Sequence, residues 1–223
     1  MQFGTCLSHI LQKIWEANPA DAPVWLFKWG ISDTFHRCNL LPSDIRKFTY
    51  VVPPLLVDPN VLICIELVIP MGWVNSPELF CSTSETVANN SDGYALDPSP
   101  YFFVYPPTAG AYKTADADTA SSGRLQYVDV YIDDLLCFAQ GDPTQQQWVS
   151  EITIRSLKEI FPSLPDEVKG SDSLEKALAG DKDWDMVKDI LGWVIHTHRG
   201  ILDLSSRQRL EILYLLEIPP TQQ

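Results

Sequence analysis

The N-terminal part of the chain shows a helical pattern of apolar residues. Between residues 3 and 15 the apolar residues at helical spacing are Phe3, Leu7, Ile10, Leu11 and Ile14, and the pair Asn18-Pro19 ends the pattern. This spacing predicts an amphipathic helix that packs one face against a core.

Three strands are expected next, at residues 24–29, 47–52 and 61–69. In the second, Phe48, Tyr50 and Val52 alternate with other residues, which predicts a half-buried strand. The third is almost continuously apolar, which predicts a central strand covered on both faces. A helix should then begin near Ser76-Pro77, because proline is favoured at the first helical position.

Two short apolar runs flank Tyr131-Ile132-Asp133-Asp134. Residues 125–132 are rich in β-branched and aromatic side chains and residues 135–139 are apolar, so both are expected to be strands of a β-hairpin. Adjacent carboxylates at a hairpin tip repel each other unless a cation lies beside them, and oxygen ligands on a rigid element suit Mg²⁺. The alternative is a polar turn, in which aspartate is common for local hydrogen-bonding reasons.

Between this helix and the hairpin, residues 89–123 are rich in Ser, Asp, Pro, Gly, Ala and Thr, and we expect a long surface loop insertion. Within it, Asp116 and Asp118 lack the glycine and distal glutamate of a calcium loop, so a solvated loop is the preferred interpretation.

After the hairpin, Pro143 should open a helix that runs to Ile160. Residues 191–195 are expected to form a strand and residues 201–204 its hairpin partner, with a turn at Arg199-Gly200. Ser205 is expected to cap a final helix that ends near Leu216.

Charge and composition limit the possible partners. The chain has 223 residues, a formal net charge of −13 and 45% hydrophobic residues, which indicates a folded protein and predicts weak binding to nucleic acid. Any such binding would need a local basic surface. Two groups of three residues are candidates: Arg37, Arg46 and Lys47, and Arg199, Arg207 and Arg209. For each group, a binding surface and an ordinary solvated surface are equally good interpretations.

Five widely spaced cysteines indicate reduced core thiols and an intracellular protein, cytoplasmic or nuclear. No stretch has the length of a membrane span, so no membrane partner is expected. His196 and His198 share a strand face, but without further zinc ligands they are interpreted as exposed edge histidines.

Three segments follow one another along the chain: residues 28–37 (KWGISDTFHR), residues 70–80 (PMGWVNSPELF) and residues 131–134 (YIDD). Together they resemble the reverse transcriptase domain of retroviruses and gypsy-like retrotransposons. Residues 28–37 (KWGISDTFHR) are similar to the first motif of that family, in which an Asp and two variable residues precede Asp-Ala-Phe or Asp-Ala-Tyr. Residues 70–80 (PMGWVNSPELF) are similar to the Pro-x-Gly loop and its helix, and Tyr131-Ile132-Asp133-Asp134 to the acidic hairpin. In addition, Leu191-Gly192-Trp193 resembles the hairpin on the primer side.

The resemblance implies an α+β fold of the right-hand polymerase type: a palm with an antiparallel sheet backed by helices, partial fingers and little thumb. The palm and partial fingers would occupy residues 1–140, including the 89–123 insertion, and residues 141–223 would hold the rest of the palm and the start of a thumb or connection. It also implies template-directed DNA synthesis with Mg²⁺ or Mn²⁺ as the cofactor. The implied partners are an RNA or DNA template-primer and a deoxynucleoside triphosphate.

Residue roles follow from the same resemblance. Asp133 and Asp134 would be the catalytic residues and metal ligands. The implied substrate-binding residues are Phe35, which would close the sugar pocket, Arg37, Met71, Gly72, Tyr131 and, near the primer end, Trp193.

One departure from the family pattern affects catalysis directly. The position of the first catalytic aspartate is Gly30, and Asp33 matches only the second, non-catalytic acid of that motif. We therefore expect an impaired reverse transcriptase-like domain, recorded as part of a retroelement polyprotein and lacking the basic fingers segment and a ribonuclease H segment. The alternatives are a non-catalytic remnant of the palm fold that acts as a binding or structural module and, with less support, an unrelated metal-dependent hydrolase that uses Asp133 and Asp134.

Overall fold

The computed structural model describes residues 5–53, 61–96, 124–162 and 183–217. Its helices and strands form a mixed α+β arrangement with small antiparallel sheets. In chain order the elements are α1 (Cys6–Glu16), β1 (Val24–Gly30), the 3₁₀ turn η1 (Thr34–Arg37), α2 (Pro42–Ile45), the 3₁₀ turn η2 (Arg46–Phe48), β2 (Thr49–Val52), β3 (Leu62–Ile65), α3 (Ser76–Leu96), β4 (Gln126–Tyr131), β5 (Asp134–Gln140), α5 (Pro143–Ile160), β6 (Val187–Ile190), β7 (Trp193–His196), β8 (Ile201–Leu204) and α7 (Ser206–Glu217).

The central sheet contains β1, β5 and β4 in that spatial order, all antiparallel, with β5 in the middle. It confirms the predicted strand at residues 24–29 and the predicted hairpin around Asp133 and Asp134. Because side chains alternate across a strand, the sheet has two faces that bury different residues.

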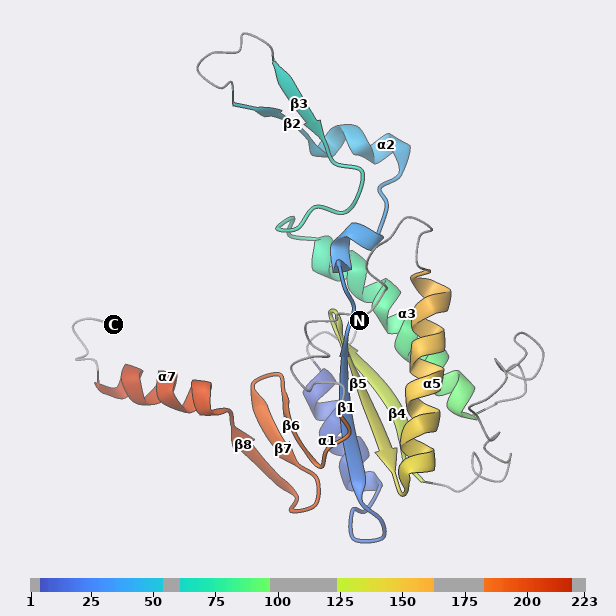
Figure 1. The fold of residues 1–223 in the computed structure, drawn as a ribbon. Helices are drawn as coiled ribbons and strands as arrows, with labels where there is room; N and C mark the ends of the chain where they lie inside the picture. The colour runs from blue at the N-terminus through green and yellow to red at the C-terminus, as the bar shows by residue number, and fades with distance from the viewer. Residues whose placement is uncertain (1–4, 54–60, 97–123, 163–182, 218–223) are drawn as a thin grey trace.

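Helices α3 and α5 cover one face of this sheet (Figure 1). Phe80 and Val87 from α3 and Val149 and Leu157 from α5 pack there against inward residues of the strands.

The start of α5 follows the usual rules of helix capping. Pro143 occupies the first turn of α5, and the Asp142 carboxylate accepts hydrogen bonds from the backbone N–H groups of Thr144 and Gln145 at 2.9 and 3.3 Å.

Helix α1 covers the opposite face and confirms the predicted amphipathic helix. Cys6, Ile10 and Ile14 face Leu136 and Phe138 of β5, as the helical spacing of the sequence required.

The third sheet, β6-β7-β8, lies beside the outer edge of β1 (Figure 1). Leu26 and Asp185 exchange backbone hydrogen bonds of 2.8 and 3.0 Å, and the Thr197 hydroxyl donates to the Val24 carbonyl at 2.5 Å. The predicted partner strand at residues 201–204 and the Ser205 cap of the last helix are confirmed, since Ser205 Oγ accepts from Gln208 N at 3.3 Å.

Four expectations about these elements are wrong. Residues 191–195 do not form one strand, because Leu191 and Gly192 have φ values of 54° and 81° and make the turn between β6 and β7. The loop expected from residue 89 begins later: α3 continues to Leu96 because Ser91 and Ala95 extend its buried face. Residues 97–123, with Asp116 and Asp118, lie outside the described residues.

The remaining two errors concern β2 and β3. Among the described strands they pair only with each other, in a ribbon that projects from the body (Figure 1). Val51 and Ile63 are 60% and 59% exposed, so β2 is not half-buried and β3 is not a central strand. The apolar run identified a strand correctly but carried no information about what covers it.

No helix in the described ranges is long and apolar enough to cross a lipid bilayer.

Candidate functional site

The acidic hairpin tip lies between the end of β4 and the start of β5. Tyr131 and Asp134 are paired across the strands, and Ile132 and Asp133 make the two-residue turn. Ile132 has a φ of 56°, a value at which two-residue turns normally place glycine. A β-branched residue in this region costs about 1–3 kcal/mol, so the surrounding contacts must hold the tip in place.

Gly30 lies directly beside this tip. It is buried, it is the last residue of β1, and it is paired with Asp134 of the neighbouring strand. The backbone N–H of Ile31 donates to the carbonyl oxygen of Asp133 at 2.8 Å. The structure therefore brings the first motif and the acidic hairpin to the same end of the central sheet.

Lys28 reaches the tip from the same strand as Gly30. Its Nζ atom is 4.0 Å from Oδ2 of Asp134, and the two side chains are 19% and 24% exposed. The pairing of Lys28 with Leu136 and of Gly30 with Asp134 places these residues on one face of the sheet. An ammonium group thus lies next to the carboxylate that the sequence predicts as a metal ligand.

These residues do not complete a paired-metal centre. Two carboxylates are present, Gly30 supplies no donor atom, and Lys28 adds a positive charge beside Asp134. Within residues 5–53, 61–96, 124–162 and 183–217, no cluster of three or more His, Cys, Asp or Glu side chains could hold a metal ion. Divalent ions in such sites need oxygen ligands and local negative charge, which this arrangement supplies only in part.

Phe35 and Arg37 follow the tip in η1. Asp33, with a φ of 52°, turns the chain out of β1. The Phe35 ring meets the buried Phe80 ring edge to face at 5.5 Å, and the Arg37 guanidinium donates from Nε to the Ser32 carbonyl at 2.8 Å. Phe35 is therefore anchored on α3, and Arg37 stabilises the turn out of β1.

Met71 and Gly72 lie in the turn that leads into α3. The Ile69 N–H donates to the Cys38 carbonyl at 2.9 Å, so the segment before this turn runs antiparallel to the segment after η1. Met71 is 74% exposed, and the buried Ser76 hydroxyl donates to the Pro70 carbonyl at 2.7 Å to hold the turn. Gly72 has a φ of 93°, which only glycine adopts readily.

Trp193 begins β7 and is paired with Ile190 and Leu204. Leu191, in the turn before it, packs against the same apolar cluster as Tyr131 of the hairpin. The primer-side motif and the acidic hairpin thus contribute to one cluster on the α1 face of the central sheet.

Both basic trios contain ion pairs. Lys47 pairs with Asp44, the Arg207 Nε atom is 2.9 Å from Glu211, and the Arg209 Nη2 atom is 2.7 Å from Asp203. The acids balance much of the positive charge that either trio could offer to a polyanion. The rings of His196 and His198 lie 6.2 Å apart. The expectation of two exposed histidines on one strand face is only partly right: His198 is exposed but lies in the turn after β7, and His196, the last residue of β7, is half-buried.

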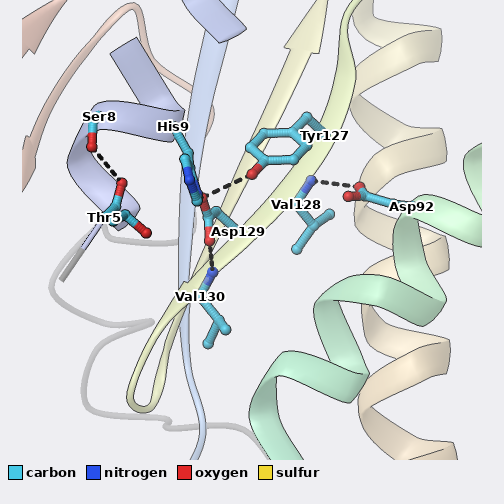
Figure 2. A network of polar contacts seen from close by, with 8 residues as sticks. All are labelled: Thr5, Ser8, His9, Asp92, Tyr127, Val128, Asp129 and Val130. Atoms are coloured by element: carbon cyan, nitrogen blue, oxygen red, sulfur yellow. Dashed lines mark hydrogen bonds and ion pairs between the residues drawn. The ribbon is translucent and has the colours of Figure 1, made fainter. Parts of the chain in front are cut away.

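A second polar cluster, which the sequence analysis missed, lies along the outer strand β4 (Figure 2). The Asp129 carboxylate is fully buried and accepts from the Tyr127 hydroxyl at 2.9 Å and from Val130 N at 2.8 Å, with His9 Nδ1 3.9 Å away. Asp92 of α3 accepts from Val128 N at 2.8 Å. These carboxylates occupy donors of a strand that has no neighbour on its outer side in the described sheet.

Burial shifts the titration of this cluster. It raises the pKa of Asp92 from 3.8 to about 7, helped by the nearby Asp129 and opposed by the Val128 N–H and by Lys13. Burial and Asp129 also raise the pKa of the Cys6 thiol to about 12 and that of the Tyr127 hydroxyl. The only sequence signal for this cluster was an aspartate within an otherwise apolar strand.

All five cysteines are free thiols, as expected, and Cys137 lies fully buried in the sheet.

Comparison with protein-family models gave no match, and comparison with curated proteins gave none either.

Proposed function

We propose that the chain is a reverse transcriptase-like domain of a retroelement polyprotein, with a palm fold, whose DNA synthesis is impaired. The observation that carries the proposal is the register of β1 and β5. It pairs Gly30 with Asp134, so the first motif segment and the acidic hairpin lie at one end of one sheet, and Phe35 of the first segment contacts Phe80 of the second.

The arrangement of the layers gives further support. A three-stranded antiparallel sheet carries the hairpin, and two helices cover the face that holds Phe27 and Leu135. In this proposal the template-primer and the deoxynucleoside triphosphate approach the end of the sheet that carries the hairpin tip. Phe35, Arg37, Met71, Gly72, Tyr131 and Trp193 would then line or support the substrate site, in the roles that the resemblance implies.

The impairment follows from charge. Phosphoryl transfer depends on neutralising negative charge on the triphosphate as the new bond forms, and the family uses Mg²⁺ or Mn²⁺ for this. Asp133 and Asp134 remain, but the position beside Asp134 carries no carboxylate. We expect synthesis to be lower than that of an intact family enzyme by orders of magnitude.

Primer extension on a poly-rA template tests the proposal. The chain as given should extend little or not at all with either metal. Gly30→Asp should restore measurable extension, because the new carboxylate would supply the missing ligand beside Asp134 and offset the charge of Lys28. Gly30→Asp/Asp134→Asn is the matched control and should be inactive. Synthesis by the unmodified chain at the level of an intact enzyme would show that the first motif is placed wrongly.

The second candidate is a non-catalytic palm-fold module, favoured by the same Gly30 and by the lysine beside Asp134. Fluorescence anisotropy with a labelled RNA–DNA duplex at low salt separates the two. The module is favoured if Phe35→Ala and Met71→Ala lose duplex binding while Gly30→Asp fails to restore synthesis. Restored synthesis in Gly30→Asp favours the enzyme.

A further inference from the structure

Lys28 is built into the acidic tip by the strand register. Side chains alternate along β1, so Leu26, Lys28 and Gly30 project to the same face, where their partners on β5 are Phe138, Leu136 and Asp134. Leu26 and Leu136 are buried against α1. The aliphatic part of Lys28 therefore runs along an apolar surface while its ammonium group reaches the carboxylate at the end of the sheet.

The position of Gly30 makes this reach possible. Asp134 belongs to the middle strand, and its two cross-strand neighbours are Gly30 and Tyr131. Gly30 places no side chain next to Asp134. Lys28 is the residue diagonal to Asp134 across the strands, a geometry in which long side chains meet.

Burial makes the charge effective. Both side chains are at least three-quarters covered, and the Nζ–Oδ2 distance is 4.0 Å. Charges in such a setting interact more strongly than exposed ion pairs do, because water and salt screen them less. The same ammonium that stabilises Asp134 repels any divalent cation that would bind the carboxylate.

We propose that Lys28 is the built-in counter-ion of the hairpin tip, and that it replaces a divalent metal at Asp134 and keeps that metal out. Loss of the carboxylate at position 30 and the presence of the lysine act together: the first removes a ligand and the second supplies a fixed positive charge. The inference rests on the geometry of the tip and holds whether or not the domain copies nucleic acid.

Mn²⁺ binding tests this directly, without a polymerase assay. The full chain is titrated with Mn²⁺, and the free ion is followed by electron paramagnetic resonance. Wild type should bind at Asp134 more weakly than about 0.1 mM, the weak range of protein divalent-cation sites. Lys28→Met, which keeps a flexible apolar stem, should bind Mn²⁺ about tenfold or more tightly, because a unit charge within several ångströms of the ion is removed.

The matched control is Lys158→Met, which removes the same charge from an exposed position on α5, the helix on the opposite face of the sheet, and should leave affinity unchanged. Lys28→Met/Asp134→Asn should return to the wild-type level. Circular dichroism confirms folding, and Lys28→Gln replaces Lys28→Met if that variant unfolds.

Two results would overturn the proposal. One is a folded Lys28 variant with wild-type Mn²⁺ affinity. The other is a wild-type site tighter than about 0.1 mM that Asp134→Asn abolishes, because the tip would then hold a metal in spite of the lysine.

Discussion

Asp92 offers a test of how the buried carboxylates of the sheet edge affect stability. Its side chain comes from α3 and accepts a hydrogen bond from Val128 N of the outer strand (Figure 2). Asp92→Asn keeps an oxygen that can accept the same bond but removes the ionisable group. The substitution therefore separates the hydrogen bond from the charge.

The sign of the effect follows from the raised pKa. Burial raises the pKa of Asp92 from 3.8 to about 7 in the folded chain, so folding favours the protonated carboxyl. The stabilisation is fully present below the unfolded-state pKa and is lost as pH rises through about 7. Each pKa unit corresponds to about 1.4 kcal/mol, so the full span is about 4 kcal/mol, of which about 2–3 kcal/mol falls between pH 5 and pH 8.

Urea unfolding followed by tryptophan fluorescence at pH 5, 6, 7 and 8 measures this. The free energy of unfolding of Asp92→Asn should rise relative to wild type by about 2–3 kcal/mol across that range. Asp183→Asn, at an exposed position before β6, should follow the wild-type curve throughout. A constant difference between Asp92→Asn and wild type from pH 5 to pH 8 would refute the reasoning, since it would mean that Asp92 titrates alike in both states.

Three further substitutions test packing and capping by urea unfolding at one pH. Asp142→Ala removes the cap of α5 and should cost about 1 kcal/mol, with Asp142→Asn close to wild type; equal losses in both would argue against capping. Phe80→Ala leaves a cavity between Phe35 and Phe161 and should lower the free energy of unfolding by about 3–5 kcal/mol. A smaller loss of stability in Phe80→Ala than in Phe80→Leu would contradict this packing. Thr197→Val removes the hydroxyl that joins the third sheet to Val24 and should cost about 1–2 kcal/mol, whereas Thr197→Ser should cost less.

Local signals in the sequence predicted much of the fold. Helices α1 and α5 follow from apolar spacing and from the Asp142-Pro143 start, and the hairpin at residues 131–134 follows from two β-rich runs around a short turn. These features depend on neighbouring residues in the chain, so the sequence contains them directly.

Burial and strand partners depend on distant residues, and there the sequence predicted less. The apolar run of β3 looks like a core strand, yet within the part of the chain that the structure describes its one ladder partner is β2, in a projecting ribbon. Asp129 lies in a predicted strand like its neighbours, but it is fully buried, with His9 of α1 3.9 Å from its carboxylate. At the candidate site, the family resemblance implied that Gly30 lies near Asp134, whereas the contact of Lys28 with Asp134 required the register of β1 against β5.

The β2–β3 ribbon has a consequence for handling the protein. Two-stranded ribbons are marginally stable in water on their own, and this one exposes Val51, Leu62 and Ile63 along strands whose outer edges carry no partner in the described sheets. Such edges recruit strands from other molecules, so concentrated samples will tend to aggregate edge to edge through this ribbon. A lysine in place of Ile63 would act as a gatekeeper there, at a distance from the hairpin chemistry.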